Sequence, residues 1–247
     1  MLIETPRCGR LFVERAKASR EKIARFGRHF VRDGVTVLTS GGSRVVGALL
    51  REAADASGAS VRFNVVYVLQ SLSSACEGTD IVSMLRGRGV AVATIAEGAV
   101  AYSMGKVDMV IVGTEGVVEN GGAISRLGTY QIALLAKAMG KPVYVVAESH
   151  KFVRLFPLSQ YDLPITQRIV EFRTDEDGEG EDGKQKAGLD LADAVDFTVS
   201  FAGPSTFFVF RNQLTQNQPP DLISGIVTES GVLTPGAVSE ELIKIWF

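Results

Sequence analysis

The sequence predicts an α/β protein built on a doubly wound, mainly parallel sheet with helices on both faces, preceded by an amphipathic helix. Five short runs rich in valine and isoleucine alternate with helical segments between residues 35 and 146. Strands that are apolar along nearly their whole length are typical of parallel sheets covered on both faces. A chain of 247 residues is also long enough to bury such a core.

The expected elements follow one another from residue 10. Apolar side chains at helical spacing over residues 10–32 predict one amphipathic helix or two short ones. Strands are then expected at 35–39, 62–69, 90–94, 108–112 and 142–146, and helices at 44–56, 80–88, 96–104, 129–139 and 239–246. Residues 174–188 are acidic and rich in glycine, which predicts a flexible surface loop.

Charge is distributed unevenly along the chain. The net charge of −2 argues against a general nucleic-acid binder, because such proteins carry a strong basic excess. Residues 7–32 nevertheless contain nine Lys or Arg and only two acidic residues, Glu14 and Glu21. This basic helix face either contacts an acidic partner or simply faces solvent. Six of the eight residues from 175 to 182 are acidic. This acidic stretch either has a regulatory role or simply faces solvent.

Compartment signals point to the cytosol. No apolar run approaches the ~18 residues of a membrane span. The first nine residues lack the apolar core of a signal peptide. The two cysteines, Cys8 and Cys76, are too few for a disulfide framework and fit a reducing compartment. No Cys/His cluster has the spacing of metal ligands, and we expect no metal, cofactor or membrane contact.

A ligand site is expected where three segments meet. In open α/β sheets ligands bind outside the carboxyl ends of the strands, which places residues 39–44, 113–129 and 147–151 together. Glycines there let backbone N–H groups approach an anion, and a helix N-terminus holds phosphate. The candidate ligand-binding residues are Ser43, Arg44, Glu115, Asn120, Gly121, Arg126, Thr129 and Lys151. The pattern indicates either a site for a small phosphorylated ligand or glycines that only shape the turns between strands and helices.

The sequence offers little for catalysis. Neither the G-x-G-x-x-G nor the G-x-x-x-x-G-K-[ST] signature is present, which argues against NAD, ATP or GTP binding by those routes. His29 and His150 have no evident partner in the sequence. Glu115, a carboxylate beside glycines at a strand end, is the most plausible acid or base. One carboxylate without a nucleophile is weak support for an enzyme.

Four long segments carry a resemblance to a known family: residues 111–122, 141–149, 151–158 and 231–244. They resemble the alpha, beta and delta subunits of translation initiation factor 2B, and the alpha type most of all. The resemblance implies a Rossmann-like C-terminal domain over residues 33–247, with residues 1–32 as the remnant of an N-terminal helical domain. It implies a homodimer and a non-catalytic regulatory subunit of the guanine-nucleotide exchange complex. Such a subunit acts in assembly with the other factor 2B subunits and in sensing phosphorylated initiation factor 2.

The wider family supplies the alternative function. It includes ribose-1,5-bisphosphate and methylthioribose-1-phosphate isomerases, which convert an aldose 1-phosphate into a ketose. Those enzymes use a cysteine shortly after the first strand and an aspartate further on, where this chain has Gly41 and Glu115. Ser125 and Arg126 match positions near the substrate phosphate. The resemblance therefore implies a site that binds a sugar phosphate or nucleotide monophosphate as a regulatory ligand but does not isomerise it.

Residues 199–218 interrupt the resemblance. Joining the segments on either side restores continuous family sequence, and the stretch combines four phenylalanines with Gln and Asn. This composition suits neither a surface loop nor a core strand. Our hypothesis is an unspliced intron or an error in the gene model, with a genuine lineage-specific loop as the alternative.

Overall fold

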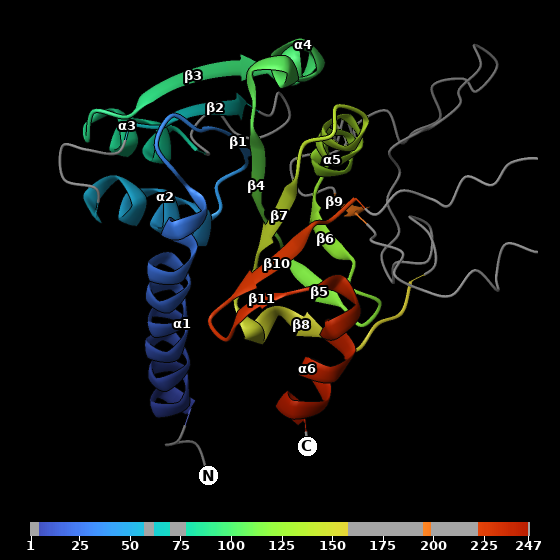
Figure 1. Ribbon diagram of the computed structural model, residues 1–247. Helices are drawn as coiled ribbons and strands as arrows, with labels where there is room; N and C mark the ends of the chain where they lie inside the picture. Colours follow the sequence, from blue (N-terminus) through green and yellow to red (C-terminus); the bar gives the residue numbers. More distant parts are fainter. Residues whose placement is uncertain (1–4, 57–61, 70–77, 158–194, 199–221, 247) are drawn as a thin grey trace, which may run out of the picture.

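The computed structural model describes residues 5–56, 62–69, 78–157, 195–198 and 222–246 (Figure 1). Its centre is a seven-stranded sheet in the order β11-β10-β7-β4-β1-β2-β3. The strands are β1 (Thr36–Ser40), β2 (Asn64–Leu69), β3 (Ala91–Ala96), β4 (Met109–Gly113), β7 (Val143–Val146), β10 (Gly225–Thr228) and β11 (Gly231–Leu233).

Neighbouring strands of this sheet run parallel except β10 and β11. The chain moves outward from β1 through β2 to β3 and then returns to β4 on the other side of β1. This is the doubly wound order, and its direction reverses between β1 and β4. The predicted fold class is confirmed.

Two hydrophobic cores lie on opposite faces of the sheet. Val37 and Val65 belong to one core, and the next residues along the same strands, Leu38 and Val66, belong to the other. The first core is covered by α2 (Arg44–Ala56) and α3 (Thr79–Arg86). The second is covered by α4 (Val100–Ser103), α5 (Thr129–Ala138) and α6 (Val238–Trp246). Burial of alternate residues on both faces explains the near-continuous apolar strands in the sequence.

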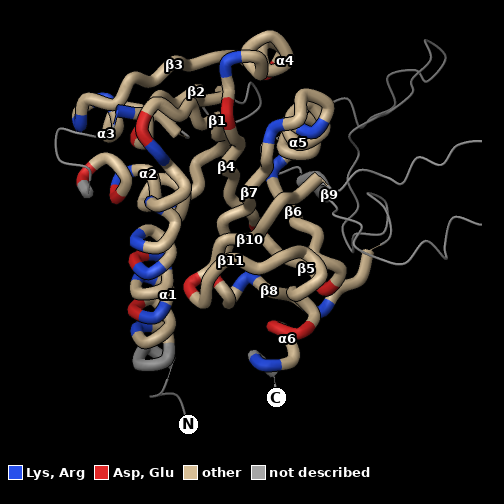
Figure 2. The backbone as a smooth tube through the Cα atoms, viewed as in Figure 1, with Lys and Arg blue, Asp and Glu red and all other residues tan. Residues whose placement is uncertain are grey.

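The N-terminal segment forms one long helix, α1 (Thr5–Gly27), followed by the 3₁₀ turn η1 (Arg28–Phe30). Ile23 is fully buried in the core beneath α2, so the last turns of α1 are part of the folded domain. Leu11 and Phe12 near its start are about half exposed, at 48% and 56%. Figure 2 shows basic and acidic residues interleaved along α1. Treatment of residues 1–32 as the remnant of a separate domain stays a prediction.

A second, smaller sheet occupies stretches for which the sequence predicts neither strand nor helix. It contains β5 (Gly116–Val118), β6 (Ala123–Arg126), β8 (Phe152–Val153) and β9 (Val195–Thr198), in the order β8-β5-β6-β9. Val117 and Ala123 are completely buried and belong to the second core. These strands have two to four residues each, which is too short a pattern for the periodicity argument.

Smaller departures occur elsewhere. The expected helix at 96–104 is divided into the 3₁₀ turn η2 (Glu97–Ala99), α4 and the 3₁₀ turn η3 (Met104–Lys106). A further 3₁₀ turn, η4 (Ser149–Lys151), leads into β8, and η8 (Pro235–Ala237) leads into α6. The predicted acidic loop at 174–188, the insertion at 199–218 and Cys76 lie outside the described residues. Within the described part of the chain, no helix combines the length and apolar character needed to cross a membrane.

Candidate functional site

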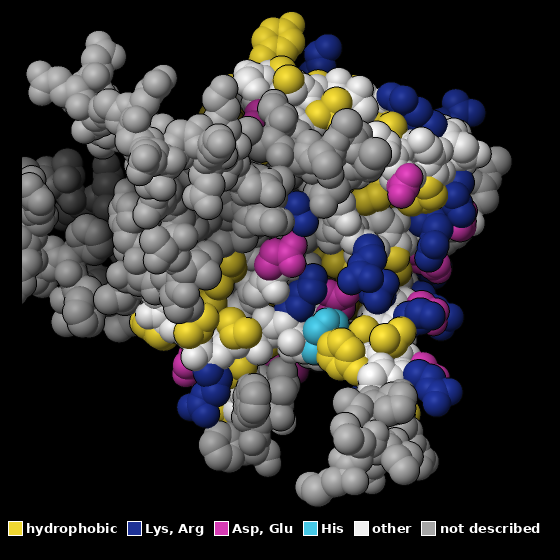
Figure 3. Space-filling view, turned by 180° about the vertical axis from the view of Figure 1, so that it is seen from behind, with side chains coloured by type: hydrophobic (Ala, Val, Ile, Leu, Met, Phe, Trp, Pro, Cys, Tyr) yellow, Lys and Arg dark blue, Asp and Glu magenta, His cyan; other side chains and the backbone are white. Residues whose placement is uncertain are grey.

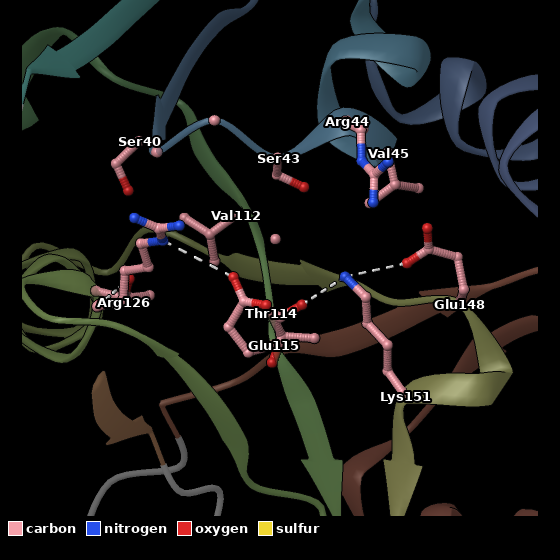
Figure 4. A pocket seen from close by; sticks show the side chains of 14 residues that line it. Ser40, Ser43, Arg44, Val45, Val112, Thr114, Glu115, Arg126, Glu148 and Lys151 are labelled. Atoms are coloured by element: carbon pink, nitrogen blue, oxygen red, sulfur yellow. Dashed lines mark hydrogen bonds and ion pairs between the residues drawn. The ribbon is translucent and has the colours of Figure 1, made fainter. Parts of the chain in front are cut away.

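A pocket of about 270 Å³ opens at the carboxyl ends of β1, β4 and β7, at the point where the strand order reverses (Figure 4). This is where open α/β sheets bind their ligands. All three segments that the sequence places together contribute to it. The lining residues are Ser40, Gly41, Gly42, Ser43, Arg44, Val45, Val112, Gly113, Thr114, Glu115, Arg126, Thr129, Glu148 and Lys151.

The connection from β1 to α2 forms one wall of the pocket. Gly41 has φ = 71°, a left-handed conformation that glycine adopts without steric cost. The hydroxyl of buried Tyr67, on the neighbouring strand β2, donates a hydrogen bond of 2.5 Å to the Gly41 carbonyl. Ser43 precedes the first residue of α2, and its carbonyl accepts from Gly47 N–H at 3.0 Å. The wall therefore presents the free N–H groups and the positive dipole end of α2 to the pocket.

The ends of β4 and α2 approach each other closely. A Cβ atom added to Gly113 would lie 2.2 Å from Ser43 Oγ and 2.5 Å from Ser43 Cβ. Thr114 follows, and its side chain is buried and hydrogen-bonded to the carbonyls of Gly116 and Ile124 at 2.7 and 2.6 Å. The close packing fixes the pocket floor and leaves the Thr114 carbonyl directed toward the pocket.

Cationic side chains reach the pocket from three elements. Arg44 begins α2, is exposed, and has no ion-pair partner among the described residues. Arg126 ends β6, and its Nε lies 3.8 Å from Glu115 Oε1, which is 58% exposed at the side-chain level. An ion pair at that distance with an exposed carboxylate contributes little to stability.

Lys151 is held more firmly. Its Nζ donates a hydrogen bond of 2.8 Å to the Thr114 carbonyl and lies 3.2 Å from Glu148 Oε2. Glu148 follows β7 and is only 5% exposed. A second cation, Arg20 of α1, places its Nε 3.4 Å from Glu148 Oε1. Three lining cations, Arg44, Arg126 and Lys151, thus face two lining carboxylates, and the excess positive charge suits a small anion.

Six of the nine predicted site residues line this pocket: Ser43, Arg44, Glu115, Arg126, Thr129 and Lys151. Their role as ligand contacts stays a prediction. Thr129 opens α5, and its hydroxyl donates to the Arg126 carbonyl at 2.8 Å. Helix α5 thereby braces the strand end that carries Arg126.

The other three predicted residues lie outside the lining of this pocket, and their role as ligand contacts also stays a prediction. Asn120 lies in the turn between β5 and β6, where its amide nitrogen donates to the Pro157 carbonyl at 2.7 Å. Gly121 has φ = 81°, and its Cα faces Pro235 so closely that a Cβ would lie 2.3 Å from the proline carbonyl oxygen. Ser125 is buried, and its hydroxyl points to the Gly113 carbonyl at 3.3 Å. All three belong to the hairpin of β5 and β6.

Sequence reasoning missed Glu148 as a site residue. Its signal was available, because a carboxylate directly after the buried strand 142–146 lies at the ligand-binding edge. Arg20 gave no such signal, since its approach to Glu148 depends on how α1 packs. The lining contains no cysteine or histidine. No cluster of three or more potential metal ligands occurs among the described residues.

Comparison with known proteins places these features in context. Residues 6–235 match the family model described as the initiation factor 2 subunit family. The translation initiation factor eIF2B subunit alpha of Dictyostelium discoideum is 37% identical over 238 residues, which cover 96% of this chain and 67% of that protein. The ribose 1,5-bisphosphate isomerase of Archaeoglobus fulgidus is 32% identical over 146 residues, covering 59% of this chain and 45% of the isomerase.

Solved structures agree on the fold. The tetrameric eIF2B-beta2-delta2 complex from C. thermophilum contains a chain that matches with a TM-score of 0.62 and 21% identity. The match covers 96% of this chain and 62% of that chain.

Proposed function

This chain belongs to the initiation factor 2 subunit family, and from that membership we propose that it is a regulatory, non-catalytic subunit of the translation initiation factor 2B guanine-nucleotide exchange complex. It acts in the cytosol as a homodimer that assembles with the other factor 2B subunits and senses phosphorylated initiation factor 2. The 37% identity to an alpha subunit over 96% of the chain supports this assignment more strongly than the 27% identity to a putative methylthioribose-1-phosphate isomerase over 92% of it.

One observation carries the non-catalytic part of the proposal. By resemblance, the related isomerases have a cysteine where this chain has Gly41, and Gly41 lines the pocket without a side chain. Glu115, at the position of the isomerase aspartate, is a longer carboxylate paired loosely with Arg126. A proton transfer that needs two precisely placed groups loses one of them here. The pocket keeps its anion-binding parts without the group that the isomerisation requires.

The pocket itself is proposed to bind a sugar phosphate or nucleotide monophosphate as a regulatory ligand. The N-terminus of α2 and the side chain of Arg44 suit the phosphate. Glu115 and Ser40 suit hydroxyl groups of a sugar, since a carboxylate and a serine both accept hydrogen bonds from them. The volume of about 270 Å³ limits the ligand to a small molecule.

Affinity purification of the tagged chain from its native cells, followed by identification of bound proteins, tests the assembly proposal. We expect the other factor 2B subunits and initiation factor 2 among the bound proteins. Incubation of the pure chain with ribose 1,5-bisphosphate should leave the compound unchanged. Conversion to a ketose, together with the absence of every factor 2B subunit from the purified material, would replace this proposal with the isomerase function.

Calorimetry with ribose 5-phosphate and with adenosine monophosphate tests the ligand proposal separately. We expect binding of at least one compound at or below millimolar concentration, and weaker binding by Arg44→Ala. Absence of any heat of binding up to that concentration contradicts the ligand proposal and leaves the assembly proposal standing.

A further inference from the structure

A buried carboxylate connects the pocket to the N-terminal helix. Glu148 is 5% exposed and lies between two cations from different elements, Arg20 of α1 and Lys151 of η4. Arg20 Nε and Glu148 Oε2 are both buried, and neither makes an aligned hydrogen bond, although the ion-pair distances are 3.4 and 3.2 Å. Opposite charges attract at this range without directional alignment. The three groups form a buried ion network held by charge.

We propose that Arg20, which lies outside the pocket, sets the anion affinity of the pocket through Glu148 and Lys151, so that docking of α1 and ligand binding are coupled. The inference rests on the proposed function, since it requires the pocket to take a phosphate-bearing ligand.

The coupling arises because both Glu148 and an anion in the pocket require the charge of Lys151. Its ammonium group is fixed by the Thr114 carbonyl and faces both the pocket and Glu148. Figure 4 shows it pointing away from its own turn toward these partners. While Arg20 neutralises Glu148, Lys151 is available to an anion. Without Arg20 the buried carboxylate depends on Lys151 alone, and the local charge becomes more negative by one. Both changes weaken anion binding, and partial burial prevents solvent from screening them.

The position of Arg20 on α1 makes this network sensitive to the whole helix. Ile23 and Ala24 lie three and four residues further on, which places them on the same face of α1 as Arg20. Both are buried against the domain, at 0% and 4% exposure. Any movement that lifts this face removes Arg20 from Glu148. Because linkage is reciprocal, a ligand that needs Lys151 free also favours the docked position of α1.

Figure 3, seen from the side opposite to the view of Figure 1, shows Lys and Arg side chains close to Asp and Glu side chains on this face of the molecule. A partner that contacts α1 would reach the pocket through the ion pair of Arg20 with Glu148, without touching the ligand. This assigns α1 a regulatory role that its packing alone does not require.

Calorimetric titration of the full chain with ribose 5-phosphate tests the inference in four variants. Arg20→Leu should bind at least about fivefold more weakly than the wild type, the lower end of ordinary coupling. Glu148→Gln removes the competing charge and should bind more tightly than the wild type. The double variant Arg20→Leu/Glu148→Gln should bind more tightly than Arg20→Leu alone. Arg25→Leu removes the same charge from an exposed position of α1 that has no partner among the described residues, and should match the wild type.

Each alternative result is informative. Equal affinities of the wild type and Arg20→Leu overturn the coupling but leave the ligand proposal standing. A double variant as weak as Arg20→Leu means that Arg20 acts through helix position rather than through Glu148, and also overturns it. Absence of binding by the wild type removes the ligand proposal and the inference together. If Arg20→Leu does not fold, Arg20→Gln tests the same loss of charge, and Arg20→Lys, which retains the charge, should keep wild-type affinity.

Discussion

At the scale of single residues, Gly113 at the end of β4 lies too close to Ser43, directly before α2, to accept a side chain. Replacement of Gly113 by alanine would place a Cβ 2.5 Å from Ser43 Cβ, an atom that cannot rotate away. We expect Gly113→Ala to lower the free energy of unfolding by about 1–3 kcal/mol, the range for an overpacked core. It should also weaken ribose 5-phosphate binding, because α2 must shift. Urea denaturation and calorimetry measure the two effects.

Gly116→Ala is the matched control, three residues further along the chain. Its new Cβ would meet nothing nearer than the Lys151 carbonyl oxygen at 3.7 Å, an ordinary contact. We expect no loss of stability from this variant. A loss equal to that of Gly113→Ala would mean that any methyl group in this segment is harmful and that the contact with Ser43 is not special.

The environment of Glu97, in the turn after β3, predicts that the stability of the protein depends on pH. Desolvation by burial raises the pKa of this carboxyl above its ordinary value of 4.5. A folded-state pKa above the unfolded one gives stability that is complete below the unfolded pKa and is lost as the pH rises through the folded pKa. Glu97→Gln should therefore unfold like the wild type at low pH and become relatively more stable as the pH rises past 4.5. Urea denaturation between pH 3.5 and 7 checks this, and a constant difference across that range contradicts it.

At the scale of elements, the junction of α1 with α2 depends on one glycine. A Cβ on Gly27 would lie 2.3 Å from Leu49 Cδ1 and 2.8 Å from its Cγ, and Leu49 is 1% exposed. Gly27→Ala should lower the free energy of unfolding by about 1–3 kcal/mol by separating the two helices. The same change at exposed Gly9 meets nothing within 4 Å and should raise helix stability by up to about 1 kcal/mol. Thermal unfolding of the pair distinguishes packing from helix propensity; equal effects would contradict the packing argument.

The sequence predicted the elements whose patterns are long. Helix α2 occupies residues 44–56 as expected, because an apolar stripe and a preceding glycine pair mark both its face and its start. The five predicted strands, which are β1, β2, β3, β4 and β7, agree within about two residues. The last two strands of the main sheet, β10 and β11, were not predicted. The second sheet was missed because its strands are too short to show a period, and glycines between them read as loop. Val117 and Val118 are buried there only because β8, from a segment about 35 residues later, lies beside them. No local pattern in the sequence predicts the pairing of β5 with β8.

The same limit governs the site. Residues within a few positions of a predicted strand end, such as Arg44 and Glu115, line the pocket because the sheet edge fixes their place. Asn120 and Gly121 were grouped with them by glycine content, yet the hairpin of β5 and β6 directs that turn toward Pro157 and Pro235. The contact of Arg20 with Glu148 could not be predicted from the sequence. It depends on the packing of a helix more than 100 residues from Glu148, which no local pattern encodes.

At the scale of the whole molecule, the pocket lies between the two halves of the doubly wound sheet, so a bound ligand should stabilise both. Ser43 follows β1, Thr114 follows β4 and Lys151 follows β7, and only the folded chain brings these three connections together. Ribose 5-phosphate at a hundred times its Kd should raise the free energy of unfolding by about 2.7 kcal/mol, since a ligand that binds only the native state stabilises it by mass action. Thermal unfolding over a range of ligand concentrations measures the rise.

The loss of that stabilisation in chosen variants locates the ligand. Arg44→Ala should shift the concentration dependence to higher ligand concentration, because it removes the one lining cation without an ion-pair partner in the described chain. Arg32→Ala removes an exposed arginine ahead of β1 and outside the pocket lining, and should leave the wild-type response unchanged. An equal response from Arg44→Ala and Arg32→Ala would place the anion elsewhere on the molecule. If only Arg44→Ala shifts the concentration dependence, the ligand phosphate binds where the strand order reverses, and its binding there stabilises the whole sheet.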